Sequence, residues 1–252
     1  MKKKSGIQNQ NFTTKYTKMP ATKRKYGVSK AKSTRPLKRR VALRTYSGAT
    51  SSILPMSLDH QLLKQKQDVV LRYHETFTVN PGLGGTPGFY VFRSNSCYDP
   101  NFTGTGHQPR GYDQIMTMYQ FLAVKECQME CWFTTSDGAP VVGSISARGT
   151  GTSGAATRDG VMEQKTAVFK TAGGISAAGP GYVSIRVKPW ELAGTSLKEN
   201  DYKHGEATNP VITQFLEFNA LPFENTDSGE VKCVARITYH CQVTEPRTPP
   251  VS

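Results

Sequence analysis

Lysine and arginine side chains gather near the start of the chain in a pattern suited to binding phosphate. Residues 1–58 contain ten lysines and five arginines and no aspartate or glutamate, so this stretch carries a formal charge of +15. Each of these side chains that neutralises a phosphate releases a condensed counterion, which allows binding to nucleic acid without reading its sequence. The side chains expected to contact nucleic acid are Lys2, Lys3, Lys4, Lys15, Lys18, Lys23, Arg24, Lys25, Lys30, Lys32, Arg35, Lys38, Arg39, Arg40 and Arg44.

Two basic clusters and three aromatic residues add to this pattern. Lys23-Arg24-Lys25 and Lys38-Arg39-Arg40 are separated by twelve residues, a spacing that suits a two-part nuclear localisation signal. Phe12, Tyr16 and Tyr26 could stack on unpaired bases. The plain alternative for the whole stretch is a solvated tail that only aids solubility.

The balance of charge changes abruptly after residue 58. The remaining 194 residues hold 17 basic and 19 acidic side chains, a balance of −2, against +13 for the whole chain. A segment as charged and as poor in large aliphatic side chains as residues 1–58 cannot offset the entropy of ordering it. We therefore predict a largely disordered basic arm, residues 1–58, and a folded domain, residues 59–252, which is long enough for one sizeable core.

Neither a leader peptide nor a membrane span is indicated. Polar residues, and not an apolar core, follow Lys2–Lys4. No stretch approaches the ~18 consecutive apolar residues of a membrane span. We expect a soluble intracellular product with no membrane insertion.

Histidines that could bind a metal or act as a catalytic base are scattered through the chain. A metal-dependent enzyme on a small β-barrel would need closely spaced histidines and a carboxylate on facing strands. No such pair exists in the sequence. The histidines are His60, His74, His107, His204 and His240.

The cysteines form an odd, scattered set, unlike the disulfide framework of a small secreted domain. A site of four thiolates is conceivable, because two cysteines share a face in each of two predicted strands. Zinc ligands usually lie two to four residues apart, however, whereas the spacing from Cys233 to Cys241 spans roughly 26 Å along a strand. We therefore expect reduced, buried thiols, no metal and no cofactor. The cysteines are Cys97, Cys127, Cys131, Cys233 and Cys241.

No motif for enzymatic catalysis stands out. The glycine-rich run at residues 149–154 lacks the Gly-Lys-Ser/Thr ending of a phosphate loop. No set of serine, histidine and aspartate suggests a nucleophile either. We expect no enzymatic activity.

Short runs of alternating residues, divided by glycine and proline, predict a β-rich domain. Residues 68–79 place Leu71, Tyr73 and Phe77 on one face, and residues 230–243 alternate in the same way. Eight short strands with long connections indicate an all-β sandwich or barrel, and fit an eight-stranded antiparallel jelly roll. The remaining strands are predicted near residues 88–93, 118–134, 140–147, 161–171, 181–188 and 211–219, with a short helix at 113–118.

A dense motif occupies the loop after the second predicted strand and the start of the third. Proline fixes φ in Asp99-Pro100 and Gln108-Pro109, and glycine allows turns or a close backbone approach. His107 could be a metal ligand or a base, but we favour hydrogen bonding within the loop, because no second ligand lies at a suitable spacing. The motif residues are Asn95, Asp99, Pro100, Gly104, Gly106, His107, Gln108, Pro109, Gly111, Asp113, Gln114, Tyr119, Phe121 and Val124.

This segment resembles the capsid proteins of circular single-stranded DNA viruses that encode a replication initiator, the circovirus-like group. Such capsids often carry Asn, Asp-Pro, Gly-Thr-Gly-His-Gln-Pro, Gly and Asp-Gln in this order, and then a Tyr-x-Phe/Tyr-x-x-Val strand. The likeness is detailed over residues 95–124 and looser over 230–243. Residues 182–194 depart from many relatives, which have a lysine pair followed by an aromatic residue and glycine.

The resemblance implies a structural viral protein. Its jelly-roll domain would self-assemble into an icosahedral T=1 virion of about 60 copies, and its arm would package a single-stranded DNA genome, or RNA on heterologous expression. It also implies assembly in the host nucleus, with nuclear import receptors and a host cell-surface receptor as partners.

Two other classes of protein remain as alternatives. A non-viral basic nucleic-acid-binding protein, ribosomal or chromatin-like with a β-sandwich body, would explain the arm but not the motif. An enzyme with a basic targeting tail would need a clustered polar pocket, which the sequence does not indicate.

Overall fold

The computed structural model describes residues 63–136, 139–149, 151, 156–173, 179–223 and 229–247. The basic side chains of the predicted arm, the predicted localisation signal and the predicted boundary at residue 58 all lie outside these ranges. The fold and its contacts are therefore those of the jelly-roll domain alone.

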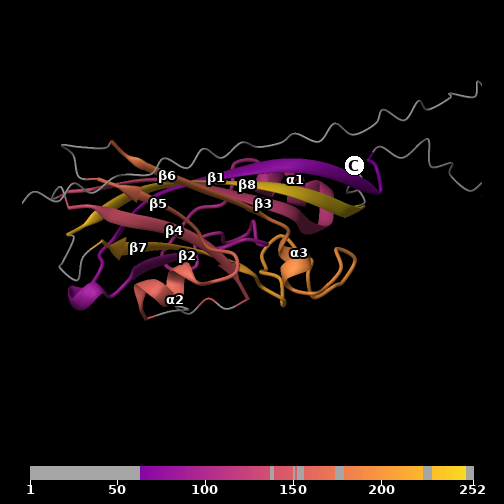
Figure 1. Cartoon of the computed structure of the whole chain (residues 1–252). Coiled ribbons are helices and arrows are strands. Elements are labelled where there is room, and N and C mark those ends of the chain that lie inside the picture. The colour runs from indigo at the N-terminus through magenta and orange to yellow at the C-terminus, as the bar shows by residue number, and fades with distance from the viewer. Residues whose placement is uncertain are drawn as a thin grey trace, which may run out of the picture. The chain divides into compact units, whose positions relative to one another are not determined.

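Eight strands form two antiparallel four-stranded sheets within the described residues. One sheet has the strand order β1-β8-β3-β6 and the other β2-β7-β4-β5. Figure 1 shows the two sheets as separate layers. This alternation of strands between facing sheets is that of a jelly roll, so the predicted fold class is confirmed. The strands are β1 (Lys66–Val79), β2 (Gly88–Arg93), β3 (Tyr119–Thr135), β4 (Val141–Arg148), β5 (Val168–Ala172), β6 (Gly181–Val187), β7 (Phe215–Pro222) and β8 (Val231–Pro246).

The long central strand β8 holds the first sheet together. It pairs with β1 from Val79 opposite Val231 to Lys66 opposite Thr244, and with β3 along its other edge. Its residues alternate between buried and more exposed positions, as the sequence pattern predicts for a half-buried strand. The apolar face of the sheet therefore points at the second sheet.

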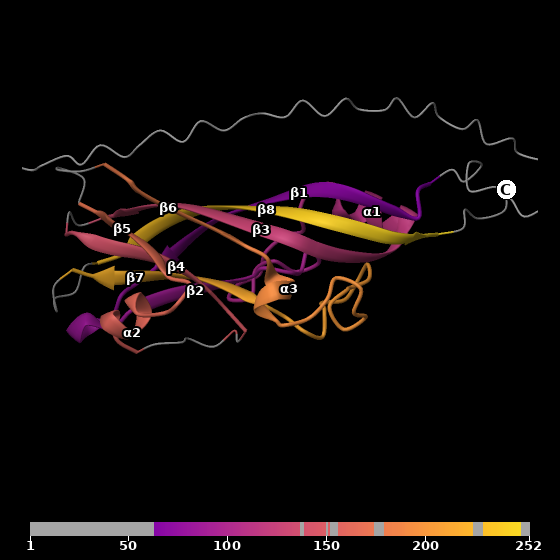
Figure 2. The ribbon, with the colours of Figure 1, turned by 45° about the vertical axis from the view of Figure 1, so that its right-hand side comes forward.

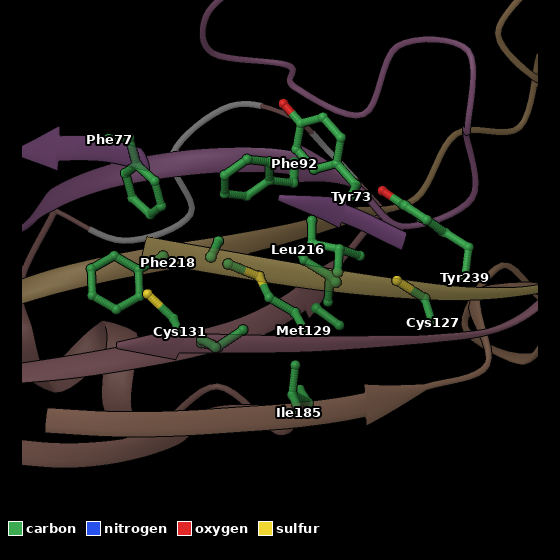
Figure 3. Packing of buried hydrophobic residues seen from close by; sticks show 14 of the residues in the cluster. Tyr73, Phe77, Phe92, Cys127, Met129, Cys131, Ile185, Leu216, Phe218 and Tyr239 are labelled. Carbon is green, nitrogen blue, oxygen red and sulfur yellow. The ribbon is translucent and has the colours of Figure 1, made fainter. Parts of the chain in front are cut away.

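The core lies between the two sheets and is rich in aromatic rings. Figure 3 shows Tyr73, Phe77 and Tyr239 of one sheet packed toward Phe92 and Phe218 of the other. The Phe77 and Phe92 rings meet edge to face with centroids 5.4 Å apart. Burial of this apolar area, at roughly 25 cal/mol per Å², is the main favourable contribution to folding.

Four short helices connect the strands in the part of the chain that the structure describes. The helix predicted at 113–118 is present as α1, and the other three were not predicted. The helices are η2 (Leu83–Gly85), α1 (Tyr112–Met118), α2 (Arg158–Met162) and α3 (Pro189–Leu192). None of the helices in the described ranges is long and apolar enough to span a membrane.

The strand prediction was wrong at two places. The first part of the predicted strand 161–171 is the end of α2 and a turn, because the Thr157 side chain caps that helix by accepting from the Gly160 N–H at 3.2 Å. Residues 211–214, predicted as strand, precede β7. The Gln214 N–H there donates to a side chain, Asn95 Oδ1, and not to a neighbouring strand.

Candidate functional site

The motif loop begins with an ion pair that closes its first turn. Arg93, at the end of β2, donates to the Asp99 carboxylate at 2.6 Å and to the Asp99 carbonyl at 2.8 Å. The Arg93 N–H donates to the carbonyl of Pro100 at 2.7 Å, and the guanidinium lies 4.9 Å from the centroid of the Phe102 ring. The turn predicted at Asp99-Pro100 is therefore held in place by Arg93, the last residue of β2.

Asn95 joins this loop to a segment more than a hundred residues away. Its amide nitrogen donates to the Ile212 carbonyl at 2.7 Å, and its oxygen accepts from the Gln214 N–H at 2.8 Å. Ser96 adds a hydrogen bond from its hydroxyl to Asn209 at 2.7 Å. Asn95 is fully buried and joins the motif loop to the segment that precedes β7.

Asn101 organises the middle of the loop next to two of the motif glycines, Gly104 and Gly106. Its amide nitrogen donates to the Tyr90 hydroxyl at 2.9 Å, and its oxygen accepts from the Gly104 N–H at 2.9 Å. A Cβ added at Gly104 would lie 2.6 Å from the Tyr90 hydroxyl, and one added at Gly106 would lie 2.5 Å from the Tyr73 hydroxyl. These positions exclude a side chain because the loop passes close to the tyrosines.

His107 lies on the surface and contacts backbone carbonyls. Its Nδ1 is 2.8 Å from the Gln108 carbonyl and its Nε2 is 3.0 Å from the His74 carbonyl. The ring also packs against Tyr73, with centroids 4.7 Å apart. This environment ties the loop to β1.

The end of the motif leads into α1 and then into β3. Gly111 has φ +89°, a left-handed conformation that favours glycine, and precedes the helix. Tyr112 is fully buried, and its hydroxyl donates to the carbonyls of Gly205 and Glu206 at 2.9 and 3.0 Å. Tyr119 is buried at the start of β3, and its hydroxyl donates to Gln67 at 3.0 Å.

The motif residues therefore come together as one connected loop that docks on strands and on a second connection. The structure brings a buried histidine, His204, to this loop, which sequence spacing does not reveal. Its backbone pairs with Leu122 of β3 through N–H to carbonyl bonds of 2.9 and 3.0 Å. Burial lowers the pKa of His204 to about 4, so its ring is neutral at ordinary pH.

The five cysteines are reduced and buried. Cys97 and Cys241 approach each other with sulfur atoms 3.7 Å apart, and burial raises the pKa of the Cys97 thiol. Among the described residues no group of three or more histidine, cysteine, aspartate or glutamate side chains could hold a metal ion. These thiols act as small apolar side chains in the core.

The outward face of the sheet β1-β8-β3-β6 carries a second group of polar and aromatic side chains. Arg236 of β8 pairs with Glu130 of β3 at 2.8 Å and lies 5.4 Å from the centroid of the Trp132 ring. That indole packs against Tyr182 of β6 with centroids 5.3 Å apart. The alternation of β8 predicts that Arg236 faces outward, but the cross-strand neighbours follow only from the sheet order.

Comparison with known proteins gives structural similarities alone. No protein-family model matches the chain. No curated protein matches it either. The solved structures that resemble it include a decameric capsid protein of BFDV, with 13% identity over 71% of this chain and 99% of that one and a TM-score of 0.40.

Two further solved structures are viral as well. A virus-like particle of Macrobrachium rosenbergii nodavirus shares 7% identity over 74% of this chain and 97% of that one, with a TM-score of 0.41. Desmodium yellow mottle tymovirus shares 12% identity over 74% and 93%, with a TM-score of 0.34. At these identities and TM-scores the likeness concerns the fold alone.

Proposed function

We propose that this chain is a viral capsid subunit that self-assembles into a closed shell and packages single-stranded DNA with its basic arm. The observation that carries the proposal is the motif segment, residues 95–124, as part of a jelly roll. The segment resembles circovirus-like capsid proteins residue by residue, and its polar side chains form hydrogen bonds that hold one loop in place. Asn95, Asp99 and Asn101 each make hydrogen bonds that fix the loop backbone or its docking.

The charge of the arm supports the packaging role. A shell of about 60 copies would bring roughly 900 positive charges to the nucleic acid, to be set against one phosphate per nucleotide. This would neutralise much of a genome of a few thousand nucleotides. A flexible segment of about 45 residues has a root-mean-square reach of roughly 35–40 Å, enough to enter the interior of a shell.

The place of action follows from the same proposal. A single-stranded DNA capsid subunit belongs to the virion, and Lys23-Arg24-Lys25 with Lys38-Arg39-Arg40 would direct it to the host nucleus for assembly through import receptors. A host cell-surface receptor would be the further partner of the assembled shell. On heterologous expression, RNA would take the place of the DNA, because phosphate contacts do not depend on sequence.

The test compares the full chain with two variants of the arm. One lacks residues 1–45, and the other keeps the length but replaces the arm lysines and arginines by glutamine. Electron microscopy and the ratio of nucleic acid to protein are measured for each. We expect icosahedral particles from the full chain and a large loss of nucleic acid in both variants.

Two results would contradict the proposal. Equal nucleic acid content in all three proteins would remove the packaging role of the arm. A full chain that sediments as a monomer and still binds nucleic acid would favour the ribosomal or chromatin-like alternative.

Binding by the arm should fall steeply with salt and show little sequence preference.

A further inference from the structure

A cavity of about 300 Å³ opens on the first sheet, beside α3. Its size is at the lower end of the range for pockets that bind small ligands. Figure 2 shows α3 following β6 and lying close to the strands of this sheet. The residues that line the cavity are Lys125, Glu126, Arg186, Lys188, Trp190 and His240, together with Leu197.

The wall of this cavity is formed by an indole ring that the backbone fixes in place. The Trp190 Nε1–H donates to the Lys125 carbonyl at 3.0 Å, so this hydrogen bond holds the indole of α3 against β3. Pro189, at the first position of α3, is buried and sets the start of that helix. Trp190 is only half-buried, which leaves part of its surface available to a flat ligand.

Positive charge surrounds this ring. Lys188 lies 5.9 Å from the centroid of the Trp190 ring, and Lys125 and Arg186 line the same cavity. With Glu126 as the only acidic lining residue in the described part of the chain, the lining carries a formal excess of two positive charges besides His240. An aromatic surface beside several cations suits a base with its phosphate.

Two of the three cations have exposed partners: the Asp68 side chain is 64% exposed and that of Glu191 51% exposed, whereas Glu126, the partner of Arg186, is 22% exposed. Lys125 pairs with Asp68 at 2.9 Å and Lys188 with Glu191 at 2.9 Å, and Arg186 pairs with Glu126. The Lys188 side chain is 50% exposed and the Arg186 side chain 61% exposed. Exposed pairs contribute little to stability, so a phosphate can replace the carboxylates that now pair with Lys125 and Lys188 at small cost.

The surface continues from the cavity across the sheet. His240 of β8 lies opposite Glu126 of β3. Four residues farther along the same outward face, Arg236 lies opposite Glu130. The next outward residue of β3, Trp132, lies opposite Tyr182 of β6. The sheet thus presents a second aromatic pair with Arg236 on the same outward face. Both tryptophans of the chain lie on this face.

The outward face of the other sheet has a different character. Ser144 of β4 and Glu217 and Asn219 of β7 point away from the core, yet all three are fully buried. A ligand cannot reach these side chains without displacing what covers them. The centre of that face is therefore closed, whereas the first sheet presents accessible cations beside aromatic rings.

We propose that the cavity beside Trp190 binds a nucleotide unit of single-stranded nucleic acid, with the base against the indole and the phosphate held by Lys125, Arg186 and Lys188. This site in the folded domain acts in addition to the arm. The proposal rests on the proposed function for the identity of its ligand, single-stranded DNA. Contacts with one base and its phosphate would read no sequence, as packaging requires.

The test uses the fluorescence of Trp190 in the full chain. The variant Trp132→Phe leaves Trp190 as the single tryptophan, and the arm contains none. The protein is titrated with short oligodeoxythymidine. We expect quenching of the Trp190 emission, and a rise of about tenfold in the half-saturating oligonucleotide concentration when Lys125→Gln and Lys188→Gln are added, since two phosphate contacts are lost.

A matched control removes the same charge elsewhere. Lys165→Gln with Lys170→Gln changes two exposed lysines, in the turn before β5 and in β5 of the other sheet. This pair should leave the titration of Trp190 unchanged. Circular dichroism of every variant verifies that the β-fold is retained.

Photocrosslinking with bromouracil-containing oligonucleotide gives an independent measurement. Trypsin releases Trp190 in the peptide 187–198, because the bond between Lys188 and Pro189 resists cleavage. We expect adducts on this peptide. If the full chain binds the oligonucleotide without quenching Trp190 and without adducts on the peptide, the inference is overturned while packaging by the arm stands. A full chain that does not bind the oligonucleotide at all would overturn both.

Discussion

The backbone N–H of Cys97 donates to Nε2 of His204 at 3.4 Å, inside the core of the domain. The opposite ring nitrogen, Nδ1, lies 3.1 Å from the carbonyl of Gly205. Both contacts are satisfied by one neutral form of the imidazole, with the proton on Nδ1 and the lone pair on Nε2. A proton added to Nε2 would face another donor, and the charge would be buried.

This relationship predicts a loss of stability in mild acid. Burial lowers the pKa of His204 from 6.5 to about 4, so the unfolded chain takes up a proton that the folded chain refuses. The stabilisation is fully present above pH 6.5 and is lost as the pH falls from there through 4. For a shift of this size the loss is on the order of 3 kcal/mol in the free energy of unfolding.

Urea unfolding at a series of pH values measures this contribution. The variant His204→Gln keeps an acceptor for the Cys97 N–H but cannot titrate, so its stability should vary less between pH 6.5 and 4 than that of the natural chain. His74→Gln changes an exposed ring and serves as the control. Parallel pH dependences in the natural chain and His204→Gln would show that the buried ring is not responsible.

The ring of Phe133 contacts two glycines that belong to different sheets, Gly143 of β4 and Gly181 of β6. A Cβ added at either glycine would overlap the ring. Because overpacking a well-packed core typically costs about 1–3 kcal/mol, Gly143→Ala and Gly181→Ala should each lower the free energy of unfolding by about that amount.

A double-mutant cycle identifies the cause of that loss. Phe133→Leu removes the ring and should make the added methyl group less costly, giving a measurable coupling energy with each glycine variant. Thermal or urea unfolding supplies the four free energies of each cycle. Strictly additive effects would mean that the glycines are needed for another reason, such as backbone conformation.

The sequence predicted the strands whose patterns repeat over many residues. In β1 and β8, Leu71, Tyr73, Ile237 and Tyr239 alternate with polar residues, and the structure buries all four of them. The short element α2 was missed because it has no room for a helical period. Its signal is the capping side chain of Thr157, which a strand-like run of apolar residues obscured.

The candidate sites were predictable only where they are continuous in the chain. The loop from Asn95 to Gly111 could be recognised as one motif, although its docking partner Gln214, 119 residues from Asn95, could not. The cavity beside Trp190 was not foreseen, since Lys125 and His240 come to it from β3 and β8. Their proximity is a product of the strand order.

Arg148 and Glu217 form a buried ion pair between β4 and β7. The Glu217 side chain is 0% exposed and that of Arg148 12% exposed. Within the described residues, Glu217 Oε1 and two of the Arg148 nitrogens make no hydrogen bond. Burial also lowers the pKa of Arg148, in keeping with an incompletely compensated charge.

We predict opposite effects for breaking and for replacing this pair. Glu217→Gln leaves the guanidinium buried without its carboxylate and should cost about 3–5 kcal/mol, whereas Arg148→Met with Glu217→Leu should be close to neutral. Asp68→Asn breaks the exposed pair with Lys125 and should cost less than about 1 kcal/mol. Urea unfolding of the four proteins tests the order. A double variant as unstable as Glu217→Gln would indicate that the polar groups have partners which the pair itself does not supply.

Asn95 connects the motif loop to the segment before β7 through two hydrogen bonds. Removing its side chain should release the loop from that segment. In Asn95→Ala the Ile212 carbonyl and the Gln214 N–H both lose their partner. Because an unsatisfied buried group costs about 1–3 kcal/mol, we expect the free energy of unfolding to fall by about 2–6 kcal/mol where both groups remain buried.

The neighbouring residue provides the comparison for Asn95. Ser96→Ala removes one hydrogen bond to the Asn209 side chain at 2.7 Å and a long one of 3.5 Å from the Asp99 N–H. It leaves both partners of Asn95 in place, so it should cost only about 1 kcal/mol. Hydrogen exchange adds a local readout, because the Gln214 amide should lose its protection in Asn95→Ala and keep it in Ser96→Ala. Equal protection of that amide in both variants would place the anchor of the loop elsewhere, with Arg93 and Asp99 as the next pair to examine.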